Sequence, residues 1–182
     1  EWTRLCWKWA AQFGHVEVLR WAAGRGLDIN VGEVMRFAAS NGSLKVLRWG
    51  QERGFPLEAE TLRNALNMAI EEGCIDVLRW TVAAGCALQL NDCRVAALLN
   101  RVKMLKFLRE RGCPWDETAC EAAVRNNSPE ALKFLREHGC PWDATACAAA
   151  VGDLKVLKYL RERGCPWDET VCAKAARVNN LK

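Results

Sequence analysis

The strongest constraint on this chain is a short sequence unit that recurs along nearly its whole length. A leucine followed by Arg or Lys and then by an aromatic residue occurs six times, with the leucines at Leu19, Leu47, Leu78, Leu105, Leu132 and Leu157. A glycine lies seven residues after each leucine, and Gly or Asn lies five residues before it. Such periodicity is typical of an array of one repeated structural unit rather than of a chain folded around a single core.

The columns around these leucines predict helical hairpins. Gly and Asn readily take the left-handed conformation that ends a helix, so the two columns are expected to end a first and a second helix. Between these ends, apolar residues are too broadly spread for a helix with one buried stripe, which favours packing against neighbours on both sides. An alanine nine residues before each leucine allows close helix approach. We expect six helix pairs and a partial seventh in a single array over residues 1–182.

Two units depart from the common length. The third has four extra residues between Gly54 and Ala69, about one helical turn. In the sixth, Cys147 lies one residue before Ala148, whereas the matching cysteines elsewhere lie three residues before their alanines. Either the turn of the sixth unit is rebuilt or two residues are absent from the chain. Because neither end carries a polar capping repeat, the chain is expected to be a segment of a longer protein.

The repeat resembles the ankyrin repeat. Residues 14–19 and then 26–30 are similar to its second helix and exit, and residues 118–123 stand where that family has its Thr-Pro-Leu-His-x-Ala opening. Units of about 27 residues, rather than about 33, that end in Gly-Cys-Pro-Trp-Asp resemble the divergent short arrays of protists and large DNA viruses. The resemblance implies an all-α, ankyrin-like α-solenoid of stacked antiparallel helix hairpins, with the β-hairpin fingers reduced to tight turns.

Three Cys-Pro-Trp-Asp turns follow the last three second helices and are predicted to be structural. Their residues are Cys113, Pro114, Trp115, Asp116, Cys140, Pro141, Trp142, Asp143, Cys165, Pro166, Trp167 and Asp168. Proline ends the preceding helix. Asp116 or Thr118 is expected to cap the next helix, and Thr118 with Glu121 forms a capping-box pattern. The tryptophans are expected to fold over the end of the adjoining hairpin; the alternative is an exposed aromatic platform for a ligand.

The chain has ten cysteines, eight of which form four pairs with a spacing of seven residues. Small buried core residues are the favoured interpretation. Disulfide or redox pairs and metal ligands are the alternatives, although zinc ligands usually come in pairs two to four residues apart. The sequence therefore predicts no metal and no cofactor. A reducing, intracellular compartment, in the simplest case the cytoplasm, suits this cysteine usage.

Basic residues form further columns. The residue after each leucine is Arg20, Arg48, Arg79, Lys106, Lys133 or Lys158, and Arg109, Arg136 and Arg161 lie three residues later. Stacked repeats would align such columns into a stripe able to bind phosphates. However, Glu52, Glu110, Glu137 and Glu162 each lie one helical turn after a basic residue, which favours a solvated face of mixed charge. The surplus of 26 basic over 22 acidic residues is too small to imply nucleic acid by itself.

No set of hydroxyl, carboxylate and histidine residues converges at a spacing typical of catalysis, so no enzymatic activity is expected. No apolar run approaches the roughly 20 residues of a membrane span. The resemblance implies a protein–protein interaction scaffold, adaptor or structural subunit that contacts other proteins through first helices, at Glu117, Glu121, Arg125, Lys174 and Arg177. The alternative is binding of nucleic acid or an anionic surface through the Lys and Arg columns, but nucleic acid is not expected as a partner.

Overall fold

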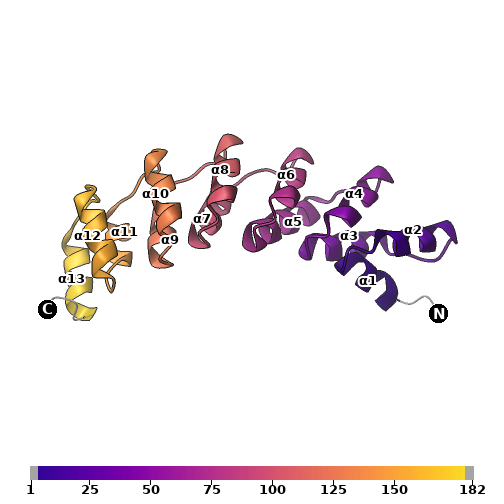
Figure 1. Cartoon of the computed structure of the whole chain (residues 1–182), viewed down its shortest axis with the longest axis horizontal. Helices are drawn as coiled ribbons and strands as arrows, with labels where there is room; N and C mark the ends of the chain where they lie inside the picture. Colours follow the sequence, from indigo (N-terminus) through magenta and orange to yellow (C-terminus); the bar gives the residue numbers. More distant parts are fainter. Residues whose placement is uncertain (1–3, 179–182) are drawn as a thin grey trace. The chain divides into compact units, whose positions relative to one another are not determined.

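The computed structural model describes residues 4–178, and within this range the chain forms thirteen α-helices and no strand (Figure 1). The helices are α1 (Arg4–Gln12), α2 (Val16–Gly24), α3 (Val31–Ser40), α4 (Leu44–Glu52), α5 (Ala59–Glu72), α6 (Ile75–Ala83), α7 (Leu90–Leu98), α8 (Val102–Glu110), α9 (Glu117–Arg125), α10 (Pro129–Glu137), α11 (Ala144–Ala149), α12 (Leu154–Glu162) and α13 (Glu169–Val178). The predicted all-helical fold, with tight turns in place of fingers, is confirmed.

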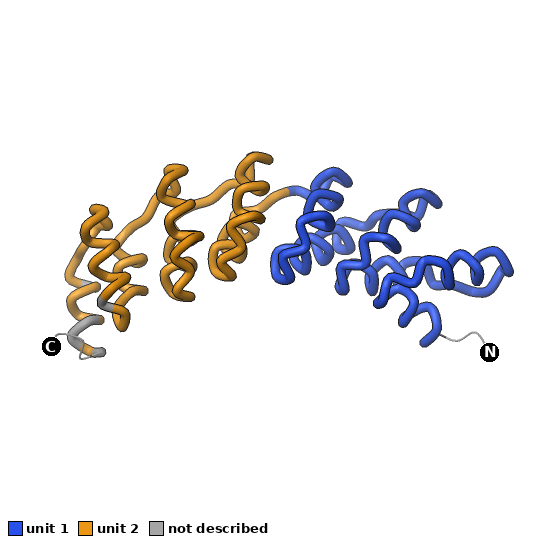
Figure 2. The backbone as a smooth tube through the Cα atoms, viewed as in Figure 1, with its two compact units in different colours: residues 1–87 blue, residues 88–182 orange. Residues whose placement is uncertain are grey.

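The helices belong to two compact units, residues 1–87 and residues 88–182 (Figure 2). In the first unit, α1, α3 and α5 pack in succession, and α2, α4 and α6 form the second row. In the second unit, α7, α9, α11 and α13 pack in succession, and α8 packs against α10. Each unit is therefore a helical-repeat solenoid of stacked hairpins. The single array over residues 1–182 stays a prediction, and the second helix expected to begin at residue 179 lies outside the described residues.

The predicted helix ends are confirmed at every repeat. The positive φ angles among the described residues fall on the two Gly and Asn columns: Gly14, Gly26, Gly42, Gly54, Gly73, Gly85, Asn100, Gly112, Asn127, Gly139, Gly152 and Gly164. The residue after the Gly or Asn that ends each first helix donates its backbone N–H to the carbonyl five residues earlier. Examples are Ser43 to Ala38 at 2.9 Å and Ser128 to Ala123 at 2.8 Å. These left-handed residues let each second helix fold back on the first within a few residues.

The two irregular repeats absorb their length changes differently. In the third, α5 has 14 residues whereas α7 has 9, so the insertion adds about one turn of helix as predicted. In the sixth, α11 has 6 residues, and Asp143 caps its start as Asp116 caps that of α9. The shortening therefore falls at the end of α11, where the Asp153 N–H bonds the Ala150 carbonyl only three residues back, at 2.9 Å.

The turn of the sixth repeat is rebuilt around this shortened helix. Cys147 remains fully buried, and Ala150 is buried where Ala148 is only half-buried. The residue equivalent to Ala123 is thus Ala150, three residues after the cysteine as in the other repeats. The alignment of the alanine column on Ala148 is wrong because the cap at the helix start, rather than the spacing from the next leucine, sets the register.

Candidate functional site

The charge of the chain is divided unequally between the two units. Residues 1–87 contain ten basic and ten acidic residues, whereas residues 88–182 contain sixteen basic and twelve acidic residues. The whole formal surplus of +4 therefore lies in the second unit. A surplus confined to one unit is a stronger signal of an anionic partner than the same surplus spread over the chain.

Within the second unit, basic residues gather on the second helices at three-residue spacing. We call the following eight side chains the basic face: Lys103, Lys106 and Arg109 on α8, Lys133 and Arg136 on α10, and Lys155, Lys158 and Arg161 on α12. Residues three apart are neighbours on one side of a helix. All of these side chains are exposed except that of Arg136, which is half-buried.

The ninth position of this pattern, near the start of α10, is the acidic residue Glu130, and a hydrogen bond ties it to the preceding repeat. Asn100, in the turn between α7 and α8, donates its side-chain amide to Glu130 Oε2 at 2.6 Å. This hydrogen bond lowers the pKa of Glu130. The Asn100 amide oxygen also accepts the backbone N–H of Ala131 at 2.9 Å. Glu130 is therefore tied to the seam between two repeats rather than paired with a lysine of the basic face.

The glutamates expected to interleave the basic columns neutralise little of this face. Lys133 Nζ lies 3.9 Å from Glu137 Oε1, and both side chains are largely exposed. Lys106 and Lys158 take part in no ion pair with the described residues. Between α8 and α10 lies a groove of about 530 Å³ whose charged lining is balanced, with Lys106, Arg109 and Lys133 against Glu110, Glu130 and Glu137. Over α8, α10 and α12 as a whole, however, eight basic residues stand against four acidic ones.

Each Cys-Pro-Trp-Asp turn fixes one arginine of the basic face. The Arg109 guanidinium lies 4.3 Å from the Trp115 ring centre, Arg136 lies 3.9 Å from Trp142, and Arg161 lies 5.6 Å from Trp167. The tryptophans are half-buried, and the Trp115 ring meets Phe134 of the next repeat edge-on at 6.4 Å. They therefore cover the hairpin ends as predicted and also stack on cations. Such stacking orders the planar guanidinium groups without removing their charge.

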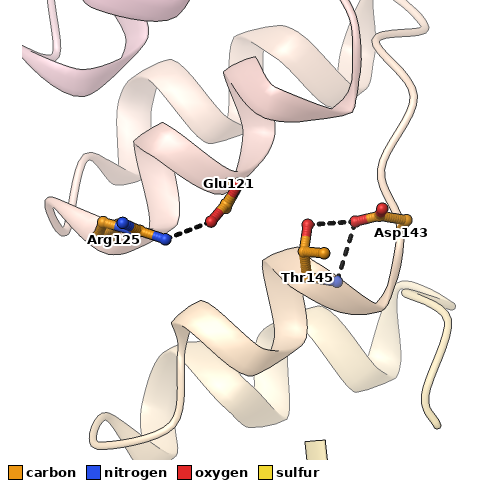
Figure 3. A network of polar contacts seen from close by, with 4 residues as sticks. All are labelled: Glu121, Arg125, Asp143 and Thr145. Atoms are coloured by element: carbon orange, nitrogen blue, oxygen red, sulfur yellow. Dashed lines mark hydrogen bonds and ion pairs between the residues drawn. The ribbon is translucent and has the colours of Figure 1, made fainter. Parts of the chain in front are cut away.

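The aspartates of these turns cap the following helices. Asp116 and Asp143 Oδ1 accept the backbone N–H groups of Thr118 and Thr145 at 3.1 and 2.9 Å, the second of which Figure 3 shows. This settles the choice between Asp116 and Thr118. The capping box predicted for Thr118 and Glu121 is wrong, because Glu121 forms an ion pair with Arg125 one turn along α9 (Figure 3).

The cysteines of the second unit pair differently from their spacing in the sequence. Cys93, Cys120 and Cys147 on first helices hydrogen bond with Cys113, Cys140 and Cys165, which lie in the turns that close the same hairpins. Each of these turn thiols also donates a hydrogen bond to the backbone carbonyl of the residue that caps the first helix. Cys113 donates to Gln89, Cys140 to Asp116 and Cys165 to Asp143, each at 3.3 Å. The thiols thus tie the two ends of each hairpin together in the core.

These contacts set the acidity of the thiols. The hydrogen bond to the partner sulfur raises the pKa of Cys93 and of Cys120, and burial raises both further. The same hydrogen bond, from Cys93, lowers the pKa of Cys113. Burial raises the pKa of Cys147 to about 12. Six of the eight paired-spacing cysteines are buried, while Cys86 is half-buried and Cys172 is exposed. No group of three or more His, Cys, Asp or Glu able to hold a metal occurs among the described residues.

The residues predicted to contact a partner lie apart from the basic face. Glu117, Glu121 and Arg125 lie on α9, and Lys174 and Arg177 lie on α13, so all five are on first helices. Glu121 is half-buried and paired with Arg125, and the other four are exposed. Their role in binding stays a prediction. The basic columns identified in the sequence did not include Lys103 and Lys155. The three-residue spacing of lysine and arginine along α8 and α12 could have revealed these two residues.

The equivalent positions of the first unit do not form a basic face. On α2, α4 and α6 they hold Arg20, Lys45, Arg48 and Arg79, but also two acidic and three uncharged residues, namely Glu17, Asp76, Ala23, Gln51 and Val82. Arg20 Nη1 lies 3.9 Å from Glu17 Oε1 on the same helix. The same repeat therefore carries different surfaces in the two units.

Comparisons with known proteins add the following findings. No protein-family model matches the chain, and no curated protein matches it. Among solved structures it is similar to the pentatricopeptide repeat protein PPR10 in complex with an 18-nucleotide psaJ RNA element, and to a triple cysteine-to-serine variant of that protein with the same RNA. For both, the identity is 16%, the TM-score is 0.41, and the match covers 96% of this chain and 31% of the other.

The prediction of a protein–protein scaffold without a nucleic-acid partner is corrected. The exclusion of nucleic acid rested on glutamates neutralising the basic columns, and in the second unit they leave Lys106 and Lys158 unpaired among the described residues. Within residues 4–178, no helix has both the length and the apolar character needed to cross a membrane.

Proposed function

We propose that this chain binds nucleic acid through the basic face of its second unit. The observation that carries the proposal is that eight of the nine positions at three-residue spacing on α8, α10 and α12 are basic, while the ninth, Glu130, is held by Asn100. Neighbouring hairpins in a stack repeat this pattern at regular intervals, as phosphates repeat along a strand. Binding of phosphates by such a face gains free energy through the release of condensed counterions.

The chemistry of the face favours contacts to the backbone over contacts to a particular sequence. Most of its members are lysines, which are flexible point charges and suit phosphate groups of varying geometry. The three arginines already lie over the rings of Trp115, Trp142 and Trp167, which restricts the positions that their guanidinium groups can take. We therefore expect binding that depends strongly on salt and weakly on base identity.

A salt titration tests this proposal. The affinity of the chain for a fluorescein-labelled single-stranded RNA would be measured by fluorescence anisotropy between low and physiological salt. We expect a steep linear fall of log affinity with log salt. The triple substitution Lys106→Ala, Lys133→Ala and Lys158→Ala should lower the magnitude of the slope by about 2, since each lost phosphate contact on a single strand removes roughly 0.7. Affinity that does not change with salt would contradict the proposal.

Three finer assignments accompany this function as proposals. The repeats are of a divergent ankyrin type, which the confirmed left-handed Gly and Asn stops and the strandless turns support. The chain works by binding and catalyses no reaction. Its compartment is reducing and intracellular, a proposal that the three buried thiol–thiol pairs support because they require unoxidised cysteines.

A further inference from the structure

An apolar pocket lies beside the shortened sixth repeat in the second unit. The pocket lies between the end of α9, the start of α10 and the exposed side of α12, and its volume is about 320 Å³. Its walls are mainly apolar, with Val124, Leu132, Val156 and Tyr159 among them. The shortened turn leads directly into α12, which supplies one wall of the pocket, and the turn residues themselves do not line it.

The hydrogen bonds between successive turns explain why the gap forms here. In the preceding repeat, the side chains of Asn126 and Ser128 donate to the Leu98 carbonyl of the turn before them, at 2.8 and 3.0 Å. In the rebuilt turn, Asp153 occupies the place of Ser128. Its carboxylate accepts the backbone N–H groups of Lys155 and Val156 at 2.9 and 3.2 Å, and so caps its own helix. The described residues of this turn therefore make no hydrogen bond to the turn of α9 and α10.

The burial of equivalent side chains shows the same separation. The residue before the repeat leucine is buried in the second to fifth repeats, where it is Val46, Val77, Met104 or Ala131. In the sixth repeat it is Val156, which is only half-buried. The repeat leucine itself is buried in the first five repeats, whereas Leu157 is half-buried. The aromatic residue two positions after the leucine is buried in the second to fifth repeats, where it is Trp49, Trp80, Phe107 or Phe134. In the sixth repeat it is Tyr159, which is half-buried. The side of α12 that should meet the preceding repeat is thus partly uncovered.

The rim of this pocket belongs to the basic face. Lys133 and Lys155 line the pocket, and Lys133 also lines the groove between α8 and α10. Asn127, which is exposed, also lines the pocket. An occupant that suits these groups is flat and largely apolar, can hydrogen bond through its edge, and is attached to a negative charge. Lysines on either side of an aromatic wall are a combination found where bases stack and their phosphates are bound.

We propose that this pocket receives one unstacked nucleobase of a single strand whose flanking phosphates contact Lys133 and Lys155. The base would lie against the ring of Tyr159, and the Asn127 amide would face its edge. This inference rests on the proposed function, and it narrows that function to single strands, because a base paired within a duplex cannot enter a side pocket. It also gives a role to the two-residue shortening, since the full-length turn of the preceding repeat is bonded to the turn before it and the described residues of the shortened turn are not.

The test compares strands with and without bases. A labelled oligothymidine and an abasic deoxyribose–phosphate strand of the same length would be titrated with the chain and with Val156→Trp, which fills the pocket. Val18→Trp is the matched control, because Val18 occupies the same repeat position, is exposed and lies in the first unit. Tyr159→Leu, which keeps the apolar volume and removes the aromatic ring, is the second variant if Val156→Trp does not fold.

We expect the wild-type chain and Val18→Trp to bind oligothymidine about tenfold more tightly than the abasic strand, as stacking of one base typically gives. Val156→Trp and Tyr159→Leu should bind both strands alike. Equal affinity of the wild-type chain for the two strands, with steep salt dependence, would overturn the pocket and leave the proposed function standing. Binding of neither strand would overturn the proposed function itself. Uptake of a fluorescent fatty acid that Val156→Trp abolishes and oligothymidine does not displace would also overturn the inference.

Discussion

The two units of this molecule use one repeat to build two different surfaces. Both have left-handed Gly or Asn stops, short helices and a buried leucine column. Residues 1–87 are electrically balanced, whereas residues 88–182 carry the whole basic surplus. The comparison teaches that the columns which specify the fold are separate from those which specify the surface. A helical repeat can therefore change its partner chemistry without changing its architecture.

The cores of the two units also differ at one pair of columns. The first-helix position occupied by Cys93, Cys120 and Cys147 in the second unit holds Trp7, Met35 and Leu66 in the first unit. The turn position occupied by Cys113, Cys140 and Cys165 holds Leu27, Phe55 and Cys86. Five of these six positions in the first unit thus hold a large apolar residue, whereas all six in the second unit hold a small thiol. The smaller pair leaves the turn close to the first helix, within hydrogen-bonding distance of its capping carbonyl.

Exchange of a residue between the units tests this difference and has the largest expected effect on stability. Cys120→Leu places the residue found at Leu66 into the thiol column, where Cys120 and Cys140 are both fully buried. We expect a loss of about 2 kcal/mol in the free energy of unfolding through overpacking, measured by urea denaturation. Adding Cys140→Ala should recover part of that loss by making room. A single substitution without effect would show that the thiol pair does not fill the core.

Alkaline pH should weaken the second unit more than the first. The pKa of Cys147 is raised to about 12 from an ordinary value of 9.0, so the folded chain retains a proton that the unfolded chain releases. Its stabilising effect is complete below pH 9 and is lost as the pH rises toward 12. The urea midpoint should therefore fall over this window, and Cys147→Ala should fall less steeply. If the urea midpoints of the wild-type chain and of Cys147→Ala fell in parallel with pH, the pH dependence could not be assigned to Cys147.

The smallest effect concerns the arginine–tryptophan stacks of the second unit. A double-mutant cycle on Arg136→Ala and Trp142→Ala should give a coupling free energy of about 0.5–1 kcal/mol, because the guanidinium is partly exposed and 3.9 Å from the ring centre. The cycle would be measured by thermal unfolding. The pair Lys158 and Trp142, which makes no ring contact among the described residues, provides the reference cycle. A coupling of zero in both cycles would mean that the stack does not order Arg136.

The sequence predicts the fold well because the repeat is specified by local rules. Gly and Asn at fixed positions predict each helix end, and the extra turn of α5 follows from four added residues. Prediction fails where the register depends on a cap rather than on spacing. Ala148 satisfies the alanine column numerically, but the Asp143 cap makes Ala150 its structural equivalent.

The candidate site is less predictable because it depends on which charges meet. The sequence contains lysines and glutamates one turn apart, and only the fold shows that Glu130 is held by Asn100 and that Lys106 stays unpaired among the described residues. The thiols illustrate the same limit. A spacing of seven residues suggests that Cys113 and Cys120 form a pair, whereas the fold brings Cys93 to Cys113 and Cys120 to Cys140.

The central claim is that nucleic acid binds the second unit because of where its charges lie and not because of how many there are. Two triple charge reversals test it most directly: Lys106→Glu, Lys133→Glu and Lys158→Glu in the second unit, and Arg20→Glu, Lys45→Glu and Arg48→Glu in the first. Both change the net charge equally and alter exposed second-helix positions. At physiological salt, we predict at least a hundredfold loss of affinity for single-stranded RNA in the first variant and nearly unchanged affinity in the second. Equal losses in the two variants would contradict the account.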